Sequence, residues 1–410
     1  MTSPAKNLLE GVTVVDLTTF LSGPYATQIL GDLGAEVIKV ESPGAGDPTR
    51  ILPPYFVEGD SAYFHSINRN KKSVVLDLKS RSGLATLCDI IAKADILVEN
   101  FRPGVMARLG LTDERIKAAN SRLVWCSLTG FGTGGPYEEF PAYDMIVQAL
   151  SGGMSMTGPA GGPAVRAGVP IGDLSAGMFS VIGILAALGA RDKSGTGSRV
   201  DVSMLDCQIS MLCYQAQYHI VSGNVPGPQG SGHDSIPTYR SFVCGDGDVI
   251  VVTANNEKMW ASLCAVLGCE QLVADPRFAT NSERLKNRQA LWAELEAAFL
   301  KFSARDLFLK LMSSGVPAAP INDVAEALKD PQVLARGMLV QATAPDHRKI
   351  DMVGNPIRVN GRDVTGYSHP PRLGEHTVSV LRDLLHYDQT TIDSLLQSRS
   401  AEQFETGRTE

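Results

Sequence analysis

The sequence predicts an α/β fold in which helices cover both faces of a parallel sheet. Short runs of β-branched and apolar residues, typical of buried strands, occur at 12–17, 36–41, 73–78, 95–99 and 123–128. Stretches with helical periodicity, such as 25–33 and 82–92, lie between most of these runs. Because strands and helices alternate, we expect βαβ units, whose parallel strands are buried on both faces.

Composition and charge restrict the class of protein. The chain has 410 residues, of which 44% are hydrophobic and 20% charged, so it is long enough for two domains with buried cores. The net charge of −7 and the lack of a long Lys/Arg run argue against nucleic-acid and anionic-membrane partners. Residues 1–11 have no apolar signal core, and Ser180 and Gly183 interrupt the longest apolar run. We therefore expect a cytoplasmic location, with an organelle left open.

Redox cofactors and metals find little support in the sequence. The segment Gly132–Gly135 follows an expected strand, but Pro136 and Tyr137 stand where a dinucleotide-binding turn needs close helix packing and a last glycine. A nicotinamide or flavin cofactor is therefore not expected. The histidines and cysteines are scattered, without HxxxH, HxH or CxxC spacing, so we expect no metal site.

A second, smaller α+β domain follows a change in composition at 221–233. That segment is rich in Gly, Pro and Ser, as in a flexible linker or an active-site loop. Two expected strands, 238–244 and 248–252, are joined by a Gly-Asp-Gly turn. Helical patterns follow at 258–267, 285–303 and 304–313. The segment 315–322 then indicates a return connection.

Asp173 stands where a glycine-rich loop meets a long apolar helix. The loop at 152–163 has neither helical nor strand periodicity, whereas apolar residues recur at helical spacing from Leu174 onward. One interpretation is that Asp173 is the N-cap of this helix. The other is that the helix dipole and the free N–H groups keep its carboxylate ionised as a nucleophile, while Gly172 leaves one side open to a substrate.

Polar and cationic residues cluster near the ends of the expected strands, where α/β folds bind ligands. They are Lys39 within the second strand, Asn70, Lys71 and Lys72 before the third, Asn100, Phe101 and Arg102 after the fourth, and Arg108 farther on. Each cluster alone is explained by a solvated surface. Because several clusters recur in an acidic chain, we also consider a small ligand with two or three phosphates.

Segments distributed over nearly the whole chain resemble the family III CoA-transferases, also known as the CaiB/BaiF family. These segments are LEGVTVVDLTTFLSGPYATQILGDLGAEVIKVESPGAGDPTR, NRNKKSVVLDL, ADILVENFRPGVMARLGL, TGFGTGGPYEEFPAYDMIVQALSGGMSMTG, VPIGDLSAGM and PPRLGEHT. The family includes formyl-CoA and carnitine CoA-transferases and the α-methylacyl-CoA racemases. The 230–242 region and the C-terminal tail look closer to its dicarboxylate branch.

The resemblance implies an interlocked-ring homodimer, with a Rossmann-like large domain and a smaller domain in each protomer. We expect the large domain at 1–205 and again at 341–410, and the small domain at 227–322. The linker at 206–226 and the return linker at 323–340 would connect them. No partner beyond the second protomer and the small-molecule substrates is expected.

The resemblance also implies roles for particular residues. Asp173 matches the family's catalytic aspartate. The CoA contacts fall on the loops around Lys39, Asn70, Lys71, Lys72, Asn100, Phe101, Arg102 and Arg108, with Tyr143 and Asp144 in the CoA or loop region. Where formyl-CoA transferases carry a glutamine, this sequence has Leu21, which argues against oxalate as acceptor. Arg166, seven residues before Asp173, is a candidate for the acceptor's remote carboxylate, against a plain surface arginine.

The expected activity is the transfer of CoA from an acyl-CoA, such as succinyl-CoA, to a carboxylic acid. The acid would be a dicarboxylic acid, and the reaction would pass through aspartyl mixed-anhydride and aspartyl-CoA thioester intermediates. Within the family the alternative is racemase-type proton transfer. That reaction uses a histidine where this chain has Tyr143, whose phenol is a poor base at neutral pH. A non-catalytic CoA-binding protein is the alternative from another class.

Overall fold

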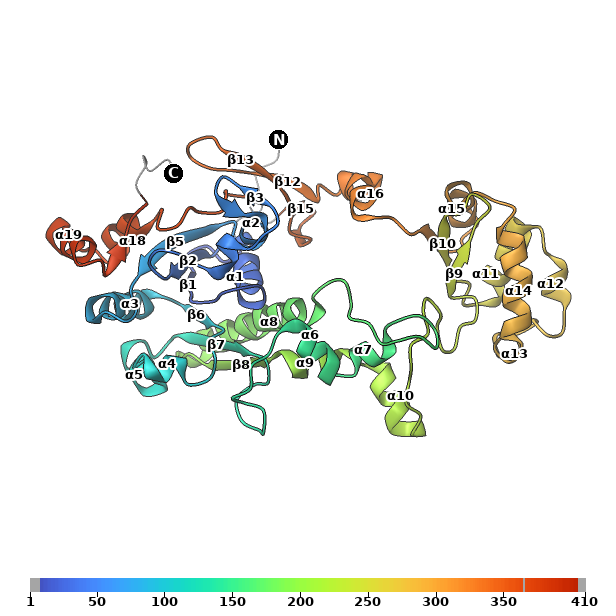
Figure 1. Ribbon diagram of the computed structural model, residues 1–410, viewed down its shortest axis with the longest axis horizontal. Helices are drawn as coiled ribbons and strands as arrows, with labels where there is room; N and C mark the ends of the chain where they lie inside the picture. The colour runs from blue at the N-terminus through green and yellow to red at the C-terminus, as the bar shows by residue number, and fades with distance from the viewer. Residues whose placement is uncertain (1–7, 364–365, 405–410) are drawn as a thin grey trace. The chain divides into compact units, whose positions relative to one another are not determined.

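The computed structural model describes residues 8–363 and 366–404, and the chain divides into two compact units (Figure 1). Unit 1 comprises 1–153, 167–221 and 334–410 within those described limits. Unit 2 comprises 154–166 and 222–333.

Unit 1 is built on a seven-stranded sheet with the order β16-β5-β2-β1-β6-β7-β8. The strands are β1 (Thr13–Asp16), β2 (Glu36–Glu41), β5 (Lys71–Leu76), β6 (Ile96–Glu99), β7 (Val124–Thr129), β8 (Arg199–Ser203) and β16 (Ala401–Glu402). All neighbours pair in parallel except β16, which pairs antiparallel to β5. The expected α/β class with a large parallel sheet is confirmed. The six parallel strands, in the order β5-β2-β1-β6-β7-β8, form a doubly wound sheet whose direction of winding changes between β1 and β6.

Helices cover both faces of this sheet because successive strand residues point to opposite sides. Val14 belongs to a core cluster with α1 (Ser22–Asp32) and α8 (Ile171–Ser194). Val15 belongs to a second cluster with α3 (Arg81–Lys93), α18 (Thr377–Asp383) and α19 (Gln389–Gln397). Both valines are fully buried, so the strands read as nearly continuous apolar runs.

Shorter elements complete unit 1. Its other helices are η1 (Pro48–Ile51), α2 (Ala62–Ile67), α4 (Val105–Arg108), α5 (Asp113–Ala119), α6 (Asp144–Leu150), α9 (Met204–Met211) and α10 (Tyr214–Ser222). Its antiparallel strand pairs are β3 (Phe56–Val57) with β4 (Asp60–Ser61), β12 (Leu339–Thr343) with β13 (Lys349–Val353), and β14 (Arg358–Val359) with β15 (Arg362–Asp363). The helices α7 (Gly153–Met156) and α17 (Pro331–Ala335) lie at the boundaries between the units.

Unit 2 has its own antiparallel sheet, β11-β10-β9, and its own core. The strands are β9 (Arg240–Val243), β10 (Val249–Val252) and β11 (Ala318–Pro320). The helices are α11 (Glu257–Leu267), α12 (Gln271–Ala274), α13 (Asn281–Lys286), α14 (Arg288–Phe299), α15 (Ala304–Ser313) and α16 (Val324–Lys329). Phe242 of β9 stacks on Phe299 of α14 with ring centroids 4.2 Å apart, which joins the sheet to the helices.

The unit boundaries differ from the domain boundaries expected from the sequence. Most of the expected linker at 206–226 is helical, because α9 and α10 occupy 204–222. The Ser203 side chain caps α9 by accepting from the Asp206 N–H, and Met204 and Cys207 are buried. In addition, 154–166 belongs to unit 2 although it was expected in the large domain.

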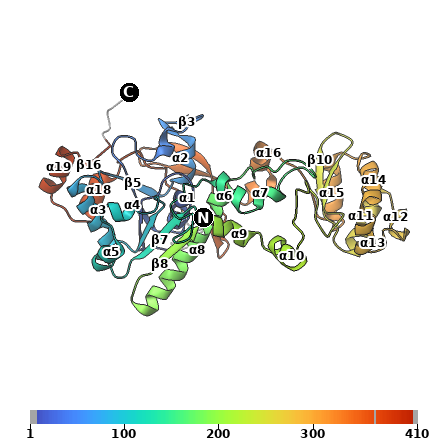
Figure 2. The same cartoon turned by 60° about the horizontal axis from the view of Figure 1, so that its bottom comes forward.

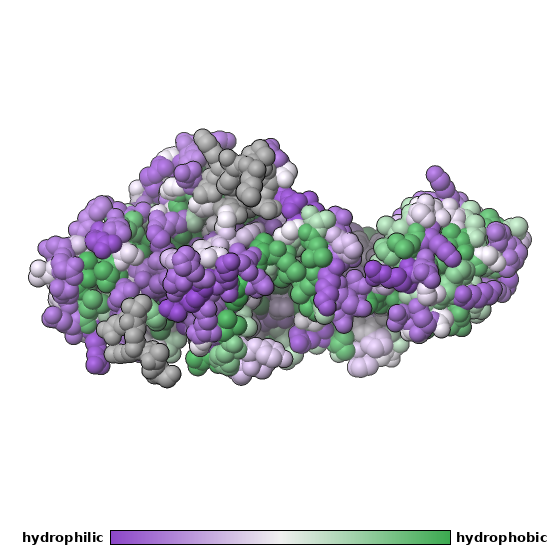
Figure 3. All heavy atoms as spheres, turned by 90° about the horizontal axis from the view of Figure 1, so that it is seen from above, coloured by the Kyte–Doolittle hydropathy of each residue, from purple (hydrophilic) through white to green (hydrophobic). Residues whose placement is uncertain are grey.

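The helix α8 lies against β7, β8 and α1 and is the longest helix among the described residues (Figure 2). By length and composition α8 could cross a membrane. Half of its most apolar window is buried within the chain, as in the core helix of a globular protein. Met178, Phe179, Ile182 and Leu185 remain exposed at helical spacing. Hydrophobic residues also gather in clusters between hydrophilic ones on the face seen in Figure 3.

Candidate active site

Asp173 is the third residue of α8 and faces a cavity of unit 1. Pro170 occupies the N-cap position and supplies no side-chain hydrogen bond, so the interpretation of Asp173 as the N-cap is wrong. The helix N-terminus is instead capped from α6, because the Gly172 N–H donates to Asp144 Oδ1 over 2.7 Å. The half-buried carboxyl group of Asp173 is therefore not committed to capping.

The cavity that contains Asp173 has a volume of about 400 Å³ and is called the Asp173 cavity below. It is lined by Thr19, Phe20, Leu21, Ser22, Tyr63, Asn100, Phe101, Arg102, Pro103, Val105, Leu128, Thr129, Gly130, Glu138, Phe140, Pro141, Ala142, Tyr143, Asp173 and Met204. Its walls include the loops that follow β1, β6 and β7. The cavity thus lies at the carboxyl ends of the strands, at the switch point where doubly wound sheets bind ligands.

The surroundings of Asp173 disfavour its charge. Burial, and after it the negative charge of Asp144, raise the pKa of this carboxyl group to about 6, although a hydrogen bond with the Ser22 side chain acts to lower it. The free helix N–H groups, which were expected to keep the carboxylate ionised, are not among the causes of the shift, and the pKa moves in the opposite direction. Near pH 7 the group is still mostly ionised, but it is more basic than an ordinary aspartate.

Close helix packing brings Ser22 to Asp173. A Cβ atom at Gly177, one turn after Asp173, would lie 2.8 Å from the Ser22 carbonyl oxygen and 3.1 Å from the Tyr25 ring. Only glycine allows α8 to approach the start of α1 this closely. Ser22 lies in one of the segments that carry the family resemblance, but the sequence did not predict its contact with Asp173.

The loop after β1 is held in an unusual conformation over the cavity. The Asn100 side chain accepts from the Thr19 N–H over 2.9 Å and donates to the Thr19 carbonyl over 2.8 Å. The next residue, Phe20, has a φ of 63°, which is uncommon for a bulky side chain. Its ring meets Tyr143 edge to face, with centroids 6.1 Å apart. Asn100 therefore acts on the shape of the cavity through both of its amide atoms.

Lys39 and Lys71 lie in the interior, where carboxylates neutralise them. Lys71 Nζ lies 3.0 Å from Asp16 Oδ2, and both side chains are fully buried. Lys39 Nζ lies 2.8 Å from Asp47 Oδ2 and donates to the Thr18 carbonyl. Both ammonium groups donate to backbone carbonyls of the segment after β1, Lys39 to Thr18 and Lys71 to Pro24. Because they are buried and already paired with carboxylates, they do not fit the expected contact with a phosphate.

Asp16, at the centre of this ion network, has the opposite environment to Asp173. Burial alone would raise its pKa, but the positive charges of Lys71 and Lys39 and hydrogen bonds from Thr18 and Thr27 together hold it well below its usual range. Its carboxylate is therefore ionised throughout the physiological range of pH.

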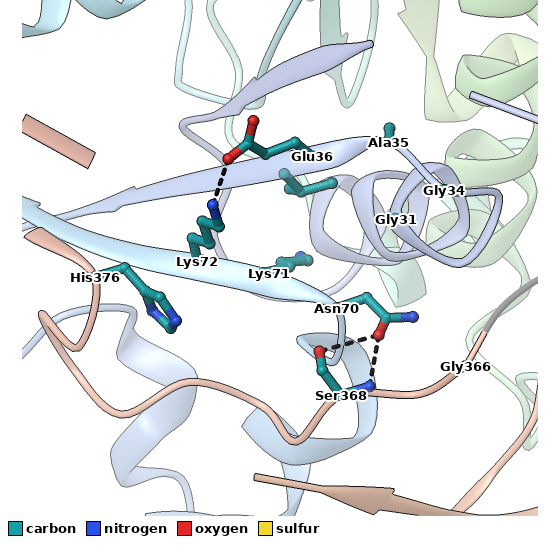
Figure 4. A pocket seen from close by; sticks show the side chains of 11 residues that line it. Gly31, Gly34, Ala35, Glu36, Asn70, Lys71, Lys72, Gly366, Ser368 and His376 are labelled. Atoms are coloured by element: carbon teal, nitrogen blue, oxygen red, sulfur yellow. Dashed lines mark hydrogen bonds and ion pairs between the residues drawn. The ribbon is translucent and has the colours of Figure 1, made fainter. Parts of the chain in front are cut away.

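Asn70 and Lys72 lie by a different cavity, called the Lys72 pocket, of about 520 Å³ (Figure 4). Lys72 Nζ forms an ion pair of 2.5 Å with Glu36. Asn70 donates to Asp32 and accepts from the backbone and hydroxyl of Ser368. Because both residues stand at the amino end of β5, they do not line the Asp173 cavity.

The other expected site residues fall into three groups. Leu21, Phe101, Arg102 and Tyr143 line the Asp173 cavity, and the Arg102 side chain is exposed. Arg108 is exposed at the end of α4, is not among the residues that line that cavity, and folds back so that Nη1 lies 3.0 Å from the Cβ position of Gly104. Arg166 is exposed and belongs to unit 2.

Gly172 serves packing rather than access. It is buried, and a Cβ atom there would lie 2.8 Å from both Gln208 Nε2 and Val147 Cγ2 and 2.9 Å from Asp144 Oδ1. The expectation that it leaves a side open to substrate is therefore wrong. Its N–H also has a partner in Asp144, so it is not a free donor for an oxyanion.

Tyr63 of α2 also lines the cavity, although the sequence gave no reason to select it. Burial raises the pKa of its phenol to about 12, and the negative charge of Asp173 contributes to this shift. Tyr63 is therefore a neutral hydroxyl group, able to donate or accept hydrogen bonds inside the cavity.

Comparison with known proteins gives a consistent result over nearly the whole chain. Residues 9–377 match the family described as CoA-transferase family III. A succinyl-CoA:glutarate CoA-transferase from Mus musculus is 38% identical over 398 residues, covering 97% of this chain and 91% of that protein. An acetyl-CoA:oxalate CoA-transferase from Acetobacter aceti is 42% identical over 365 residues, covering 88% and 92%. The crystal structure of a CaiB/BaiF family protein from Brucella suis superposes with a TM-score of 0.83 at 38% identity, covering 93% and 100%.

Proposed function

The chain belongs to CoA-transferase family III and is a CoA-transferase, and from this premise we propose that Asp173 carries CoA from an acyl-CoA to a dicarboxylic acid. The observation that carries the proposal is the Asp173 carboxylate in a cavity at the switch point of the sheet, a cavity that the exposed Arg102 also lines. An arginine there can meet a phosphate or a carboxylate of the substrates.

The first half of the proposed reaction transfers the acyl group and then CoA to Asp173. The ionised carboxylate attacks the thioester carbonyl, the C–S bond breaks, and CoA leaves as a thiolate with an acyl-aspartyl anhydride left behind. The thiolate then attacks the aspartyl carbonyl of this anhydride. The donor acid departs as a carboxylate, and Asp173 carries CoA as a thioester.

The second half passes CoA to the acceptor by the same chemistry in reverse. The acceptor carboxylate attacks the aspartyl thioester, which expels the thiolate and forms a second anhydride. The thiolate attacks the acceptor's acyl carbon, so the acyl-CoA product forms and the Asp173 carboxylate is regenerated. A carboxylate with a raised pKa suits these steps because it is ionised near neutral pH and is a stronger nucleophile than an ordinary aspartate.

The CoA contacts that we propose are those that fit the geometry of the cavity. Phe101 and Arg102 line it, and Tyr143 stands at its rim against Phe20. Arg108 remains a candidate for the outer part of CoA because it is exposed. We assign Lys39, Lys71 and Asn100 to the support of the cavity wall, and we leave Asn70 and Lys72 out of the CoA site.

The identity of the acids is proposed from the relatives. The relative from Mus musculus is named for succinyl-CoA and glutarate, and the one from Acetobacter aceti for acetyl-CoA and oxalate. We propose succinyl-CoA as donor and a dicarboxylate longer than oxalate as acceptor, because Leu21 gives an apolar wall where a polar side chain would suit a two-carbon acid. Arg166 remains a candidate for the acceptor's second carboxylate.

A second part of the proposal concerns assembly as an interlocked homodimer in the cytoplasm. Apolar side chains of α6 and α8, among them Ile146, Met178 and Ile182, are exposed in unit 1. Exposed apolar groups of this kind mark a surface that another protein covers. Sedimentation after serial dilution should show dimers at all concentrations, because threaded chains separate only on unfolding; folded monomers would contradict the interlocked arrangement.

The function is tested by mass spectrometry of reactions that contain succinyl-CoA and one acid from a panel. We expect new acyl-CoA thioesters from glutarate and similar dicarboxylates, little product from oxalate, and none from any acid with an Asp173→Asn variant. Transfer by that variant at the wild-type rate would contradict the role of Asp173. Efficient use of oxalate would contradict only the inference from Leu21.

A further inference from the structure

We propose that Asp144 is the positioning residue of the reaction, which fixes the first turn of α8 and thereby sets the place and the electrostatic surroundings of the Asp173 carboxylate. This inference rests on the proposed function of Asp173. It assigns to Asp144 a role distinct from the CoA contact expected from the sequence.

Both carboxylate oxygens of Asp144 take part in a chain of hydrogen bonds. Oδ1 accepts from the Gly172 N–H over 2.7 Å, and Oδ2 accepts from Gln148 Nε2 over 2.6 Å. Gln148 Oε1 then accepts from the Ala167 N–H over 2.9 Å. Asp144 thus holds α8 at the residue before Asp173 and, through Gln148, holds the other end of the short segment that leads into the helix.

The direction of each bond in this chain follows from the charge of Asp144. A carboxylate only accepts, so it orients Gln148 with the amide NH₂ toward itself and the carbonyl toward the Ala167 N–H. A neutral amide at position 144 can keep the bond from Gly172. The NH₂ group of that amide would then face the NH₂ group of Gln148. The single carbonyl oxygen of Gln148 already accepts from the Ala167 N–H, and in the present geometry it cannot also accept from position 144. One bond of the chain would weaken.

The packing around Gly172 leaves little room for this turn to move. Gln148 is 2% exposed, and Gln208 of α9, which is 6% exposed, lies beside Gly172 and accepts from the Ser151 hydroxyl. Asp144 itself is not among the residues that line the Asp173 cavity. Its influence on the reaction therefore passes through the position of α8 and through its charge, rather than through contact with substrate.

Charge is the second means by which Asp144 acts on Asp173. The groups that face Asp173 from neighbouring elements are Ser22 of α1, Tyr63 of α2 and Asp144 of α6. Arg102, Glu138 and Tyr143 are the other titratable or charged groups that line its cavity. Because the negative charge of Asp144 sits on the helix N-terminus, it offsets the positive end of the helix dipole, which would otherwise stabilise the Asp173 carboxylate. The result is a more basic nucleophile.

The test compares pH profiles of CoA transfer for wild type and Asp144→Asn, with succinyl-CoA and glutarate as substrates. We expect kcat at pH 7.5 to fall about tenfold to a hundredfold while the KM for succinyl-CoA is unchanged, since the loss lies in alignment. We also expect the acid limb of the profile to move to lower pH, because one negative charge near Asp173 has been removed. An unmoved acid limb, or a change confined to KM, would overturn the proposal.

Two further variants separate the hydrogen-bond chain from the charge. Gln148→Met breaks the chain but keeps the Asp144 charge, so kcat should fall while the acid limb stays. In the double variant Asp144→Asn with Gln148→Glu, the carboxylate at position 148 can accept from both the amide at position 144 and the Ala167 N–H. The negative charge is then one residue farther along the chain of hydrogen bonds. We expect kcat to recover most of its loss. Failure of this rescue in a folded double variant would overturn the positioning role.

A matched control and an internal check complete the design. Asp192→Asn removes the same charge from the exposed end of α8, roughly 28 Å along the helix, and should leave the profile unchanged. A shift as large as that of Asp144→Asn would contradict a local effect. If wild type itself transfers no CoA, the proposed function fails; if it does and the Asp144 variant has the wild-type profile, only this inference fails.

Discussion

Two aspartates of unit 1 that approach the same loop, Asp16 and Asp173, have opposite environments. Asp16 is fully buried, and the positive charges of Lys71 and Lys39 together with hydrogen bonds from Thr18 and Thr27 hold its pKa well below the usual range. Asp173 is half-buried near another carboxylate, and its pKa is raised to about 6. The difference teaches that the neighbouring charges, more than depth alone, decide whether a carboxylate is a structural anion or a reactive base.

The same contrast separates the two parts of the cavity wall. Lys71 and Lys39 use their charges to stabilise Asp16 and Asp47, and their bonds to backbone carbonyls fix the loop that carries Ser22. The pKa of Asp173 is shifted by burial and by two described residues, Asp144 and Ser22, neither of which is cationic. A rigid, neutralised support thus carries a site whose carboxylate is left reactive.

The largest expected effect is the loss of activity on replacing the reactive carboxylate. Asp173→Asn keeps the size of the side chain but removes the nucleophile, so kcat should fall by at least about a thousandfold. The melting temperature should stay the same or rise, because a disfavoured charge has been removed. A steady-state assay and thermal unfolding check both parts; a strong loss of stability would mean that Asp173 resembles Asp16.

The converse change should affect stability first. Asp16→Asn leaves Lys71 without a buried counter-charge, so the free energy of unfolding should fall by about 3–5 kcal/mol. Urea unfolding at pH 7.5 measures this loss. If the variant unfolds at the same urea concentration as wild type, the ion network is not the support that we describe.

The raised pKa of Asp173 predicts opposite trends of activity and stability with pH. Only the carboxylate attacks, so kcat should fall about tenfold per unit as the pH drops below about 6. The folded-state pKa exceeds the unfolded value of roughly 3.9, so the stability contributed by this group is full below the unfolded value and is lost as pH rises through about 6. Relative to Asp173→Asn, wild type should therefore lose stability between about pH 4 and pH 6 while it gains activity. Parallel trends would contradict this assignment.

The smallest expected effect concerns the two cavities. Arg102→Gln should raise the KM for succinyl-CoA about tenfold with little change in kcat, because a fixed charge binds ground and transition states alike. Lys72→Gln is the matched control in the Lys72 pocket and should change neither parameter more than about twofold. Equal effects of both variants would show that the CoA site extends to the amino end of β5.

The sheet was the part of the fold that sequence patterns predicted well. Strands buried on both faces leave apolar runs that are hard to mistake, as in Val14, Val15, Val37 and Ile38. The edge strands β8 and β16 were missed because one carries exposed polar residues and the other has only two residues. The helices α9 and α10 were taken for a linker, since their packing against other elements has no signature in local composition.

The candidate site was predicted in part, and the errors have physical causes. Asp173, Leu21, Phe101, Arg102 and Tyr143 meet in one cavity because each follows a strand or begins a helix at the same edge. Asn70 immediately precedes the parallel strand β5 and Lys72 is its second residue, which places both at the opposite edge. The charges of Lys39 and Lys71 look like surface charges in sequence, because their carboxylate partners come from other segments.

The most direct measurement traps the covalent intermediate on Asp173. Wild type is mixed with succinyl-CoA, quenched with hydroxylamine, digested and analysed by mass spectrometry. Since hydroxylamine attacks an activated aspartyl carbonyl, we predict a hydroxamate on Asp173 that requires succinyl-CoA and is missing from Asp173→Asn. A hydroxamate on another residue, or none from enzyme that is turning over, would contradict the central claim that the Asp173 carboxylate carries CoA.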